Sequence, residues 1–185
     1  MGRIDITPEL AARLVAAQFP HWADLPVTPV KLSGWDNATF RLGDEFSIRL
    51  PSGDGYDAQV AKEQEWLPKL ASRLPVTIPQ PVALGQPDEN YPYPWSVYRW
   101  LPGEPASLGP ITDEAAFAGE LVDFLTTLQS VDATGGPAAG PHSQMRGLPV
   151  GAWNADTRES IETLAGDIDG AAATEVWEAA LSTTW

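Results

Sequence analysis

The 185-residue sequence contains no cysteine and only two histidines, His21 and His142. Without thiolates, neither a disulfide nor a cysteine-ligated metal site can form, and two isolated histidines are too few for a zinc site or a catalytic triad. The sequence also lacks a Walker-type loop and a Gly-x-Gly-x-x-Gly motif. No run of about 18 apolar residues occurs, and the N-terminus has no apolar signal segment. These absences predict a cytoplasmic protein without a membrane partner.

Basic residues are scarce: 11 lysines and arginines stand against 25 acidic residues, which gives a net charge of −14. From Thr112 onward, the sequence contains twelve acidic residues and two basic ones. Such acidity disfavours a nucleic-acid partner, because phosphate backbones are bound by lysine and arginine. It would suit a cationic small molecule. An acidic surface that serves solubility alone is the simpler explanation.

The residues that are present predict an ordinary folded chain, with 43% hydrophobic residues and eight tryptophans. Thr7 followed by Pro8 and Glu9 predicts a helix that stops at Phe19. Gly43 and Asp44 predict a tight turn between two strands. A second helix is expected from residue 57 to about 67, with Pro68 either ending it or opening a further turn. The predicted strands are residues 27–32, 38–42, 46–50, 81–84 and 95–100.

The second half of the chain changes character after a Pro/Gly-rich connector that begins at Leu101. Thr112 is the predicted cap of a long amphipathic helix that runs to Leu128. Residues 133–150 are predicted to be loop, and helices are expected near residues 157–165 and 172–181. We therefore predict two parts: residues 1–100 as a mixed sheet-and-helix lobe and residues 101–185 as a mostly helical lobe.

Glu63 is predicted to face inward, because Val60, Glu63, Leu67 and Leu70 recur at helical spacing. A carboxylate removed from water needs a cation, and Arg49 in the strand 46–50 is the first candidate. The alternative is that Glu63 reaches solvent and pairs locally with Lys62 or Lys69. The spacing does not decide between these two.

In the strand 46–50, the side chains of Ser47 and Arg49 are predicted to point to one face, and those of Ile48 and Leu50 to the other. An arginine held by an acid beside a cleft could bind phosphate oxygens with its forked donors. The small Ser47 would leave room for a flat ligand. An arginine on a plain outer strand face is the alternative.

Two further segments are candidates for ligand contact. The turn after Ser33 can expose backbone N–H groups to an anion if its residues adopt left-handed conformations. A plain hairpin turn would have the same sequence pattern. Backbone groups at the end of the strand 95–100 could bond a purine edge, although a buried strand meeting a linker is an equal alternative. The turn residues are Gly34, Trp35, Asp36 and Asn37.

Taken together, these segments resemble the aminoglycoside phosphotransferase family, whose fold is that of protein kinases. No single motif is decisive, and the order and spacing of the segments over about a hundred residues carry the resemblance. The matching segments are Gln18-Phe19-Pro20, residues 34–37, residues 46–51, Ala61-Lys62-Glu63 and residues 98–105.

The resemblance implies an α+β, protein-kinase-like fold: an antiparallel sheet with one main helix, joined by a hinge to a truncated, mostly helical lobe. It implies ATP or GTP with Mg²⁺ as the bound nucleotide. The loop 34–37 would cover its phosphates, and Arg49, in a place usually held by lysine, would contact the α- and β-phosphates. Glu63 would orient Arg49. The hinge that reads the purine would be Tyr98, Arg99, Trp100 and Leu101.

The resemblance also implies a catalytic loop, His-Gly-Asp-x-x-x-x-Asn, and a later metal-binding aspartate, neither of which occurs in the sequence. They would be expected soon after Trp185, so the 185 residues alone are expected to be inactive, with no catalytic residue of their own. The expected function is the nucleotide-binding part of a kinase that phosphorylates a small-molecule hydroxyl. Aminoglycoside, choline, homoserine, fructosamine-type and macrolide acceptors all fit, and the first would connect the chain with antibiotic resistance.

Two alternatives from other classes stay open. The chain could be a nucleotide-binding or interaction module without catalysis, or a structural remnant without nucleotide affinity. Thermal stabilisation by Mg-ATP or Mg-GTP would be expected of the kinase part and of the non-catalytic binding module, but not of the structural remnant.

Overall fold

The computed structural model describes residues 5–32, 34–106, 109, 111–140, 143 and 145–183, so Ser33 and His142 lie outside the described residues. The chain divides into two compact units, Met1–Gly135 and Gly136–Trp185, and each is considered by itself. The first unit contains the whole sheet. The predicted lobe boundary at residue 100 stays a prediction.

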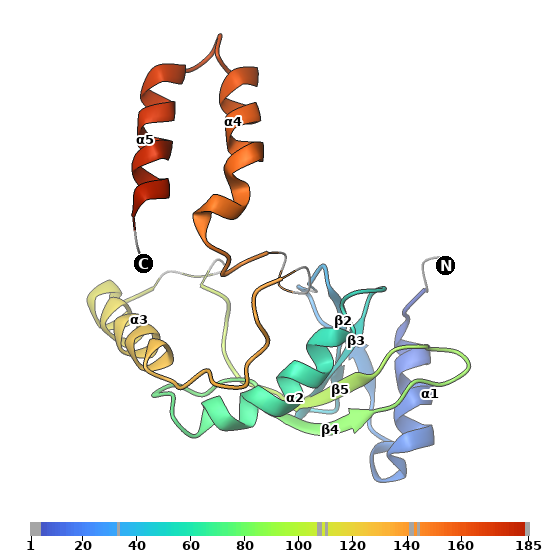
Figure 1. Cartoon of the computed structure of the whole chain (residues 1–185). Helices are drawn as coiled ribbons and strands as arrows, with labels where there is room; N and C mark the ends of the chain where they lie inside the picture. Colours follow the sequence, from blue (N-terminus) through green and yellow to red (C-terminus); the bar gives the residue numbers. More distant parts are fainter. Residues whose placement is uncertain are drawn as a thin grey trace. The chain divides into compact units, whose positions relative to one another are not determined.

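The first unit is built on a five-stranded antiparallel sheet (Figure 1), which confirms the predicted α+β, kinase-like class. The strands lie in the order β1-β2-β3-β5-β4. Gly43, with φ of 57°, opens the turn between the second and third strands, and Leu42 pairs with Phe46 across it. The strand bounds are β1 Val27–Pro29, β2 Asn37–Leu42, β3 Phe46–Pro51, β4 Pro81–Gly85 and β5 Trp95–Arg99.

The edge strand β1 ends three residues earlier than predicted, at Pro29 rather than Leu32. Proline has no N–H to donate to a ladder and is therefore confined to edges and strand ends. β5 ends at Arg99, although the N–H of Trp100 still donates to the carbonyl of Glu45 at 2.7 Å.

The two faces of the sheet differ in chemistry because successive side chains point to opposite sides. The register pairs Thr39 with Arg49 and Ser47 with both Arg41 and Tyr98. We call the two sets the core face and the polar face. The core face carries Phe40, Leu42, Ile48, Leu50, Trp95 and Val97. The polar face carries Thr39, Arg41, Ser47, Arg49, Ser96 and Tyr98.

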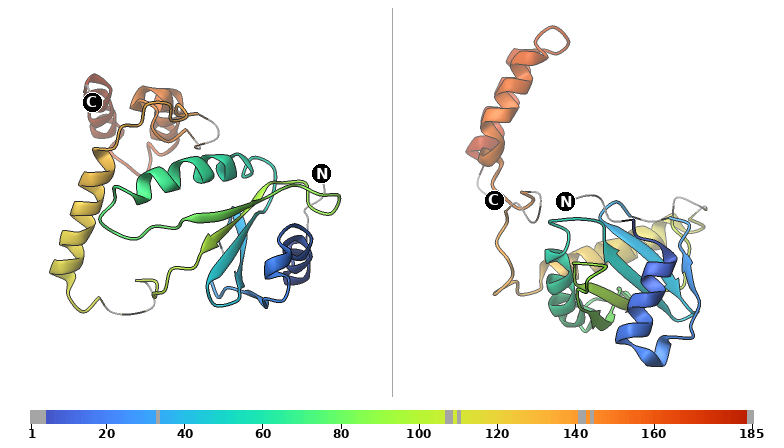
Figure 2. Two further views of the ribbon diagram at one scale, coloured as in Figure 1. Left: turned by 90° about the horizontal axis from the view of Figure 1, so that it is seen from below. Right: turned by 90° about the vertical axis from the view of Figure 1, so that its right-hand side faces the viewer.

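Helix α1, Pro8–Gln18, packs against the core face (Figure 2). It begins as predicted: the Thr7 hydroxyl accepts a hydrogen bond from the N–H of Leu10 at 3.3 Å, and Pro8 occupies the first turn. The buried side chains of α1 are Leu10, Ala11, Leu14 and Val15.

Helix α2, Ala58–Ala71, lies on the other side of the sheet (Figure 2). Gln64 ties it to the polar face, since its amide donates to the Ser96 hydroxyl at 2.9 Å and to the Ala83 carbonyl at 3.2 Å. Pro68 lies inside α2 and does not end it. The proline removes one N–H near the end of the helix, and its exposed position leaves room for the ring.

Helix α3, Glu114–Gln129, also belongs to the first unit. Its cap is Asp113, whose carboxylate accepts from the N–H of Ala116 at 2.9 Å, so the predicted cap Thr112 is wrong. Both side chains can cap a helix, and the carboxylate adds a favourable charge at the helix N-terminus.

The second unit is helical, with a short 3₁₀ turn, Val150–Trp153, followed by α4, Asn154–Thr163, and α5, Gly170–Ser182 (Figure 1). Both helices start earlier than predicted. Arg158 on α4 bonds Glu178 on α5, and the Trp177 indole donates to the Asn154 side chain at 2.9 Å. Among the described residues, no helix combines the length and apolar character needed to cross a bilayer.

Candidate functional site

An ion pair joins strand β3 to helix α2 on the polar face. One Arg49 nitrogen lies 3.0 Å from a carboxylate oxygen of Glu63, and the two side chains are 32% and 25% exposed. Lys69 instead pairs with Glu65 at 2.6 Å. Of the alternatives left open by the sequence, the structure therefore selects Arg49 as the partner of Glu63.

Tyr98 completes a three-residue cluster with this pair. Its hydroxyl donates to Oε2 of Glu63, the same oxygen that Arg49 contacts. The guanidinium carbon of Arg49 lies 5.4 Å from the centre of the Tyr98 ring, within cation–π range. Burial, followed by the hydrogen bond to Glu63 and its charge, raises the pKa of Tyr98 well above that of a free tyrosine. Tyr98 is therefore neutral at physiological pH and acts as a donor.

The sequence interpretation missed the part that the Tyr98 side chain takes in this cluster, because it assigned only the backbone of this residue to a ligand. Strand alternation contained the signal: Ser96 and Tyr98 point to one face and Val97 to the other. Ser47 lies directly across from Tyr98 and is 8% exposed. That this small side chain leaves room for a flat ligand stays a prediction.

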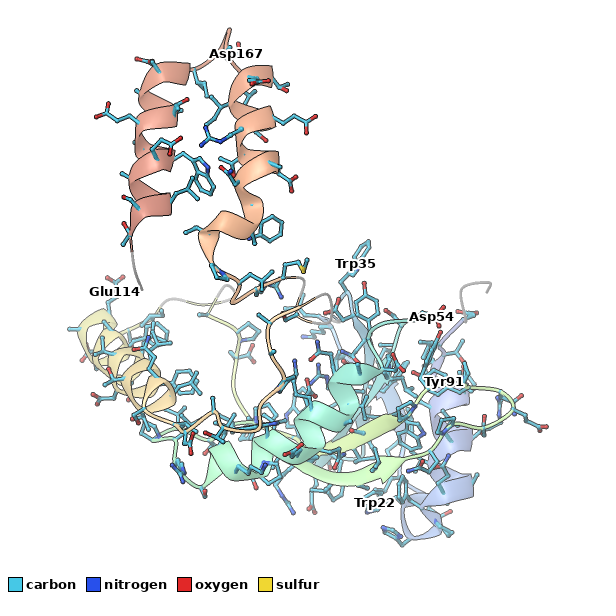
Figure 3. All side chains as sticks on the ribbon, viewed as in Figure 1. Trp22, Trp35, Asp54, Tyr91, Glu114 and Asp167 are labelled. Carbon is cyan, nitrogen blue, oxygen red and sulfur yellow. The ribbon has the colours of Figure 1, made fainter. Side chains whose placement is uncertain are left out.

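The loop before β2 does not use the left-handed conformations that its residues allow. None of Gly34, Trp35, Asp36 and Asn37 has a positive φ, and Asn37 is already the first residue of β2. Ser52 fastens the loop: its hydroxyl donates to the Trp35 carbonyl and its N–H to the Asp36 carbonyl, both at 2.9 Å. Trp35 projects from the strands (Figure 3) and is 85% exposed.

The loop keeps its donors unengaged despite this conformation. Within the described part of the chain, the N–H groups of Gly34, Trp35 and Asp36 donate to no residue. With two anchored carbonyls and three available N–H groups, the segment can meet an anion with its backbone.

The connector after β5 offers fewer backbone donors than predicted. Tyr98 belongs to the ladder with Ser47, and the N–H of Arg99 donates to the Gln80 carbonyl at 3.1 Å. The N–H of Trp100 is engaged by Glu45. Leu101 forms no backbone hydrogen bond with the described residues, so its N–H is the donor left for a ligand.

Arg41 is a second residue that the sequence interpretation did not single out. Its guanidinium carbon lies 4.0 Å from the centre of the Trp100 ring, and one of its nitrogens donates to the Asp44 carbonyl at 2.8 Å. This stack lies where the polar face meets the connector. Arg41 therefore lies on the polar face of the sheet together with Ser47 and Tyr98.

Metal-binding geometry is not apparent in the part of the chain that the structure describes, where no group of three acidic or histidine side chains converges. The polar face instead presents cations. Arg49 donates to no described residue other than Glu63, so its remaining N–H groups can bind the oxygens of an anion.

The model of the phosphotransferase enzyme family matches residues 27–184. No curated protein sequence matches the chain significantly.

Solved structures with the same fold include aminoglycoside phosphotransferases. The GDP complex of wild-type aminoglycoside 2'-phosphotransferase-IIIa has a TM-score of 0.64 at 19% identity, with 88% of this chain and 52% of that chain covered. The streptomycin–ATP ternary complex of APH(2'')-IIa has a TM-score of 0.52 at 15% identity, with coverage of 95% and 58%. Its gentamicin complex has a TM-score of 0.54 at 14% identity, with coverage of 95% and 57%. The chain thus spans about half the length of these structures.

The sheet, its covering helix and these structural similarities define a kinase-like phosphotransferase fold. Because the family model covers most of the sequence, the chain belongs to the phosphotransferase enzyme family, as the resemblance predicted.

Proposed function

We propose that this chain binds the Mg²⁺ complex of ATP or GTP on the polar face, as part of a phosphotransferase acting on a small-molecule hydroxyl. The observation that carries the proposal is the Arg49–Glu63 ion pair between β3 and α2. A cation held in place by an acid, with donors to spare, suits a polyphosphate.

Arg49 would bind oxygens of the α- and β-phosphates, and Glu63 would keep its guanidinium from folding away. The pair is about one quarter to one third exposed, so the attraction is screened, and its role is orientation more than stability. Arginine differs from lysine here because its planar fork can hold Glu63 with one nitrogen and a phosphate with the others.

The loop and the connector would contact the two ends of the nucleotide. The N–H groups of Gly34, Trp35 and Asp36 would meet phosphate oxygens, while Asn37 anchors the loop at the start of β2. The N–H of Leu101 would bond the purine edge, beside the ring of Trp100. The bound Mg²⁺ would neutralise phosphate charge.

The test is isothermal titration of the 185-residue chain with Mg-ATP and Mg-GTP, in parallel with Arg49→Ala. We expect wild-type binding and a loss of about 10- to 100-fold in the variant, the usual range for a charge-assisted contact. Arg13→Ala is the matched control, because Arg13 is exposed on α1, on the other side of the sheet. Equal affinity of Arg49→Ala and wild type would remove Arg49 from the phosphate site.

We propose that the acceptor is a hydroxyl compound with a preference for cationic ones. The acidic balance after Thr112 supports this, and two of the structures with this fold are complexes with streptomycin and gentamicin. Titration with gentamicin and with a neutral polyol of similar size tests the preference. Equal or absent binding of both would count against a cationic acceptor.

For these 185 residues the proposal is binding, because the family's His-Gly-Asp-x-x-x-x-Asn motif does not occur in the sequence. We propose transfer of the γ-phosphate for the protein in which this chain acts together with such a motif. A non-catalytic nucleotide-binding module is the alternative. Joining the chain to a segment that carries the motif and assaying phosphate transfer distinguishes the two.

A further inference from the structure

Tyr98 occupies a position on β5 that combines two contacts with the ion pair. Its hydroxyl donates to the carboxylate oxygen of Glu63 that also contacts Arg49, and its ring lies 5.4 Å from the guanidinium carbon. We infer that Tyr98 is a positioning residue that holds Arg49 ready for a triphosphate, both through Glu63 and through its own ring. This inference rests on the proposed nucleotide-binding function.

The first link acts on the carboxylate. Glu63 is presented from α2 and is one-quarter exposed, so its side chain has freedom to turn towards solvent. A hydrogen bond from a buried, neutral hydroxyl fixes the carboxylate towards β3. Because Arg49 bonds this same oxygen, fixing Glu63 also fixes the near end of the guanidinium.

The second link acts on the plane of the guanidinium. Arginine side chains have several rotatable bonds and lose much rotamer freedom when they are ordered. The Tyr98 ring lies within cation–π range of the guanidinium, and this attraction would restrict the rotamers of Arg49. A lysine at position 49 would gain less from this support, since its ammonium is not planar.

Burial and pairing within the sheet hold Tyr98 in place. The residue is 2% exposed and lies in the ladder between Ser47 on β3 and Pro81 on β4. Gln64 holds α2 to the same strand through Ser96, the next residue on the polar face. The hydroxyl therefore reaches Glu63 from a rigid strand.

The first experiment compares Tyr98→Phe with wild type for two kinds of ligand: Mg-GTP or Mg-ATP, and the corresponding nucleoside. The phenylalanine keeps the ring and loses the hydroxyl. We expect triphosphate affinity to fall by about three- to tenfold, as for one charge-assisted hydrogen bond on a screened site. Nucleoside affinity should be unchanged, because nucleosides carry no phosphate for Arg49 to bind.

Tyr91→Phe is the matched control. Tyr91 is fully buried, and its hydroxyl donates to the Pro51 carbonyl at 2.7 Å, within the core of the same unit. Its loss removes a buried tyrosine hydrogen bond without touching the ion pair. We expect lower stability and unchanged affinity for both ligands.

The second experiment needs no ligand. The ¹⁵N relaxation of the Arg49 Nε–H group, assigned by its disappearance in Arg49→Lys, reports how tightly the guanidinium is held. We expect faster local motion in Tyr98→Phe and wild-type behaviour in Tyr91→Phe.

The outcomes separate this inference from the proposed function. If the wild-type chain binds neither triphosphate, the proposed function fails and the inference fails with it. If wild type binds, and Tyr98→Phe binds as tightly with Arg49 equally rigid, the inference alone is overturned. Equal losses for nucleoside and triphosphate would also overturn it, because they would mean that Tyr98 packs against the base and does not position Arg49.

Discussion

The core face and the polar face of the sheet are made by the same strands, yet they carry opposite chemistry. On β3, Ile48 and Leu50 are fully buried beneath α1, whereas Ser47 and Arg49 point towards α2. On β5, Trp95 and Val97 join the core, and Ser96 and Tyr98 join the polar network. Each strand therefore serves both the packed core and the proposed ligand contact.

This contrast shows how the chain separates stability from its proposed function. Burial of apolar side chains is the main stabilising term of a small unit. A partly exposed ion pair adds little stability, so hydrogen-bond donors on the polar face can be kept for a ligand at little cost in stability. Substitutions on the two faces should consequently have different effects.

The largest effect is expected from Leu50→Ala on the core face. Leu50 is fully buried, and its truncation leaves a cavity that should lower the free energy of unfolding by about 2–5 kcal/mol. Urea unfolding followed by circular dichroism measures the change. Leu32→Ala is the control, since Leu32 is 61% exposed and should change stability by less than about 0.5 kcal/mol.

Gly85→Ala tests the core face by adding an atom instead of removing one. A Cβ at Gly85 would lie 1.9 Å from the ring of the fully buried Trp95, so the tryptophan must move. Overpacking of this kind costs about 1–3 kcal/mol, which thermal unfolding would detect. Gly166→Ala meets nothing within 4 Å and should be nearly neutral. Similar melting temperatures for both variants would show that Gly85 is not required by packing.

Glu63→Gln tests the polar face. The neutral amide can still accept from Tyr98, but it loses its charge towards Arg49, so triphosphate affinity should fall about fivefold, or about 1 kcal/mol. Unfolding should change little, because the pair is screened. Glu65→Gln on the same helix, whose partner Lys69 is exposed, is the control for binding titrations. A large stability loss without an affinity change would reverse the contrast between the faces.

The smallest effect concerns one tyrosine from the hydrophobic core and one from the polar face. Burial raises the pKa of Tyr91 in the core, and burial together with Glu63 raises the pKa of Tyr98. The native chain holds both protons more tightly than the unfolded chain, whose tyrosines titrate near pH 10. Both groups therefore contribute fully below that pH, and the contribution is lost as pH rises above it.

At pH 10.5 each tyrosine should reduce the free energy of unfolding by about 0.8 kcal/mol relative to neutral pH. Urea unfolding at pH 8 and 10.5 should show a smaller alkaline loss in Tyr91→Phe and in Tyr98→Phe than in wild type. Identical alkaline losses in all three chains would mean that neither hydroxyl is held in its native environment.

The secondary structure could be predicted from local signals where those signals were unambiguous. Thr7 and Pro8 gave the correct start of α1, and the alternation in β3 gave the correct faces. One error falls where two neighbouring residues could do the same task. Thr112 and Asp113 are both able to cap α3, and local propensity could not rank them.

The candidate site was predicted less completely. The helical spacing correctly placed Glu63 on the inward-facing side of α2. It could not decide whether Lys62, Lys69 or Arg49 pairs with Glu63. The Tyr98 hydroxyl and the Arg41–Trp100 stack were missed, because they depend on which strands are neighbours. The conformation of the loop 34–37 was left open, because it depends on Ser52, just beyond the end of β3, whose hydroxyl fastens the loop.

The sequence by itself determined the periodicity of each element, and hence which side chains share a face, because periodicity follows from the local geometry of a strand or a helix. Only the tertiary structure decided which faces meet. Strand order places Ser47 and Tyr98 side by side, and the packing of α2 brings Glu63 to Arg49. Contacts between residues distant in the chain depend on packing of the whole unit, which no local pattern encodes.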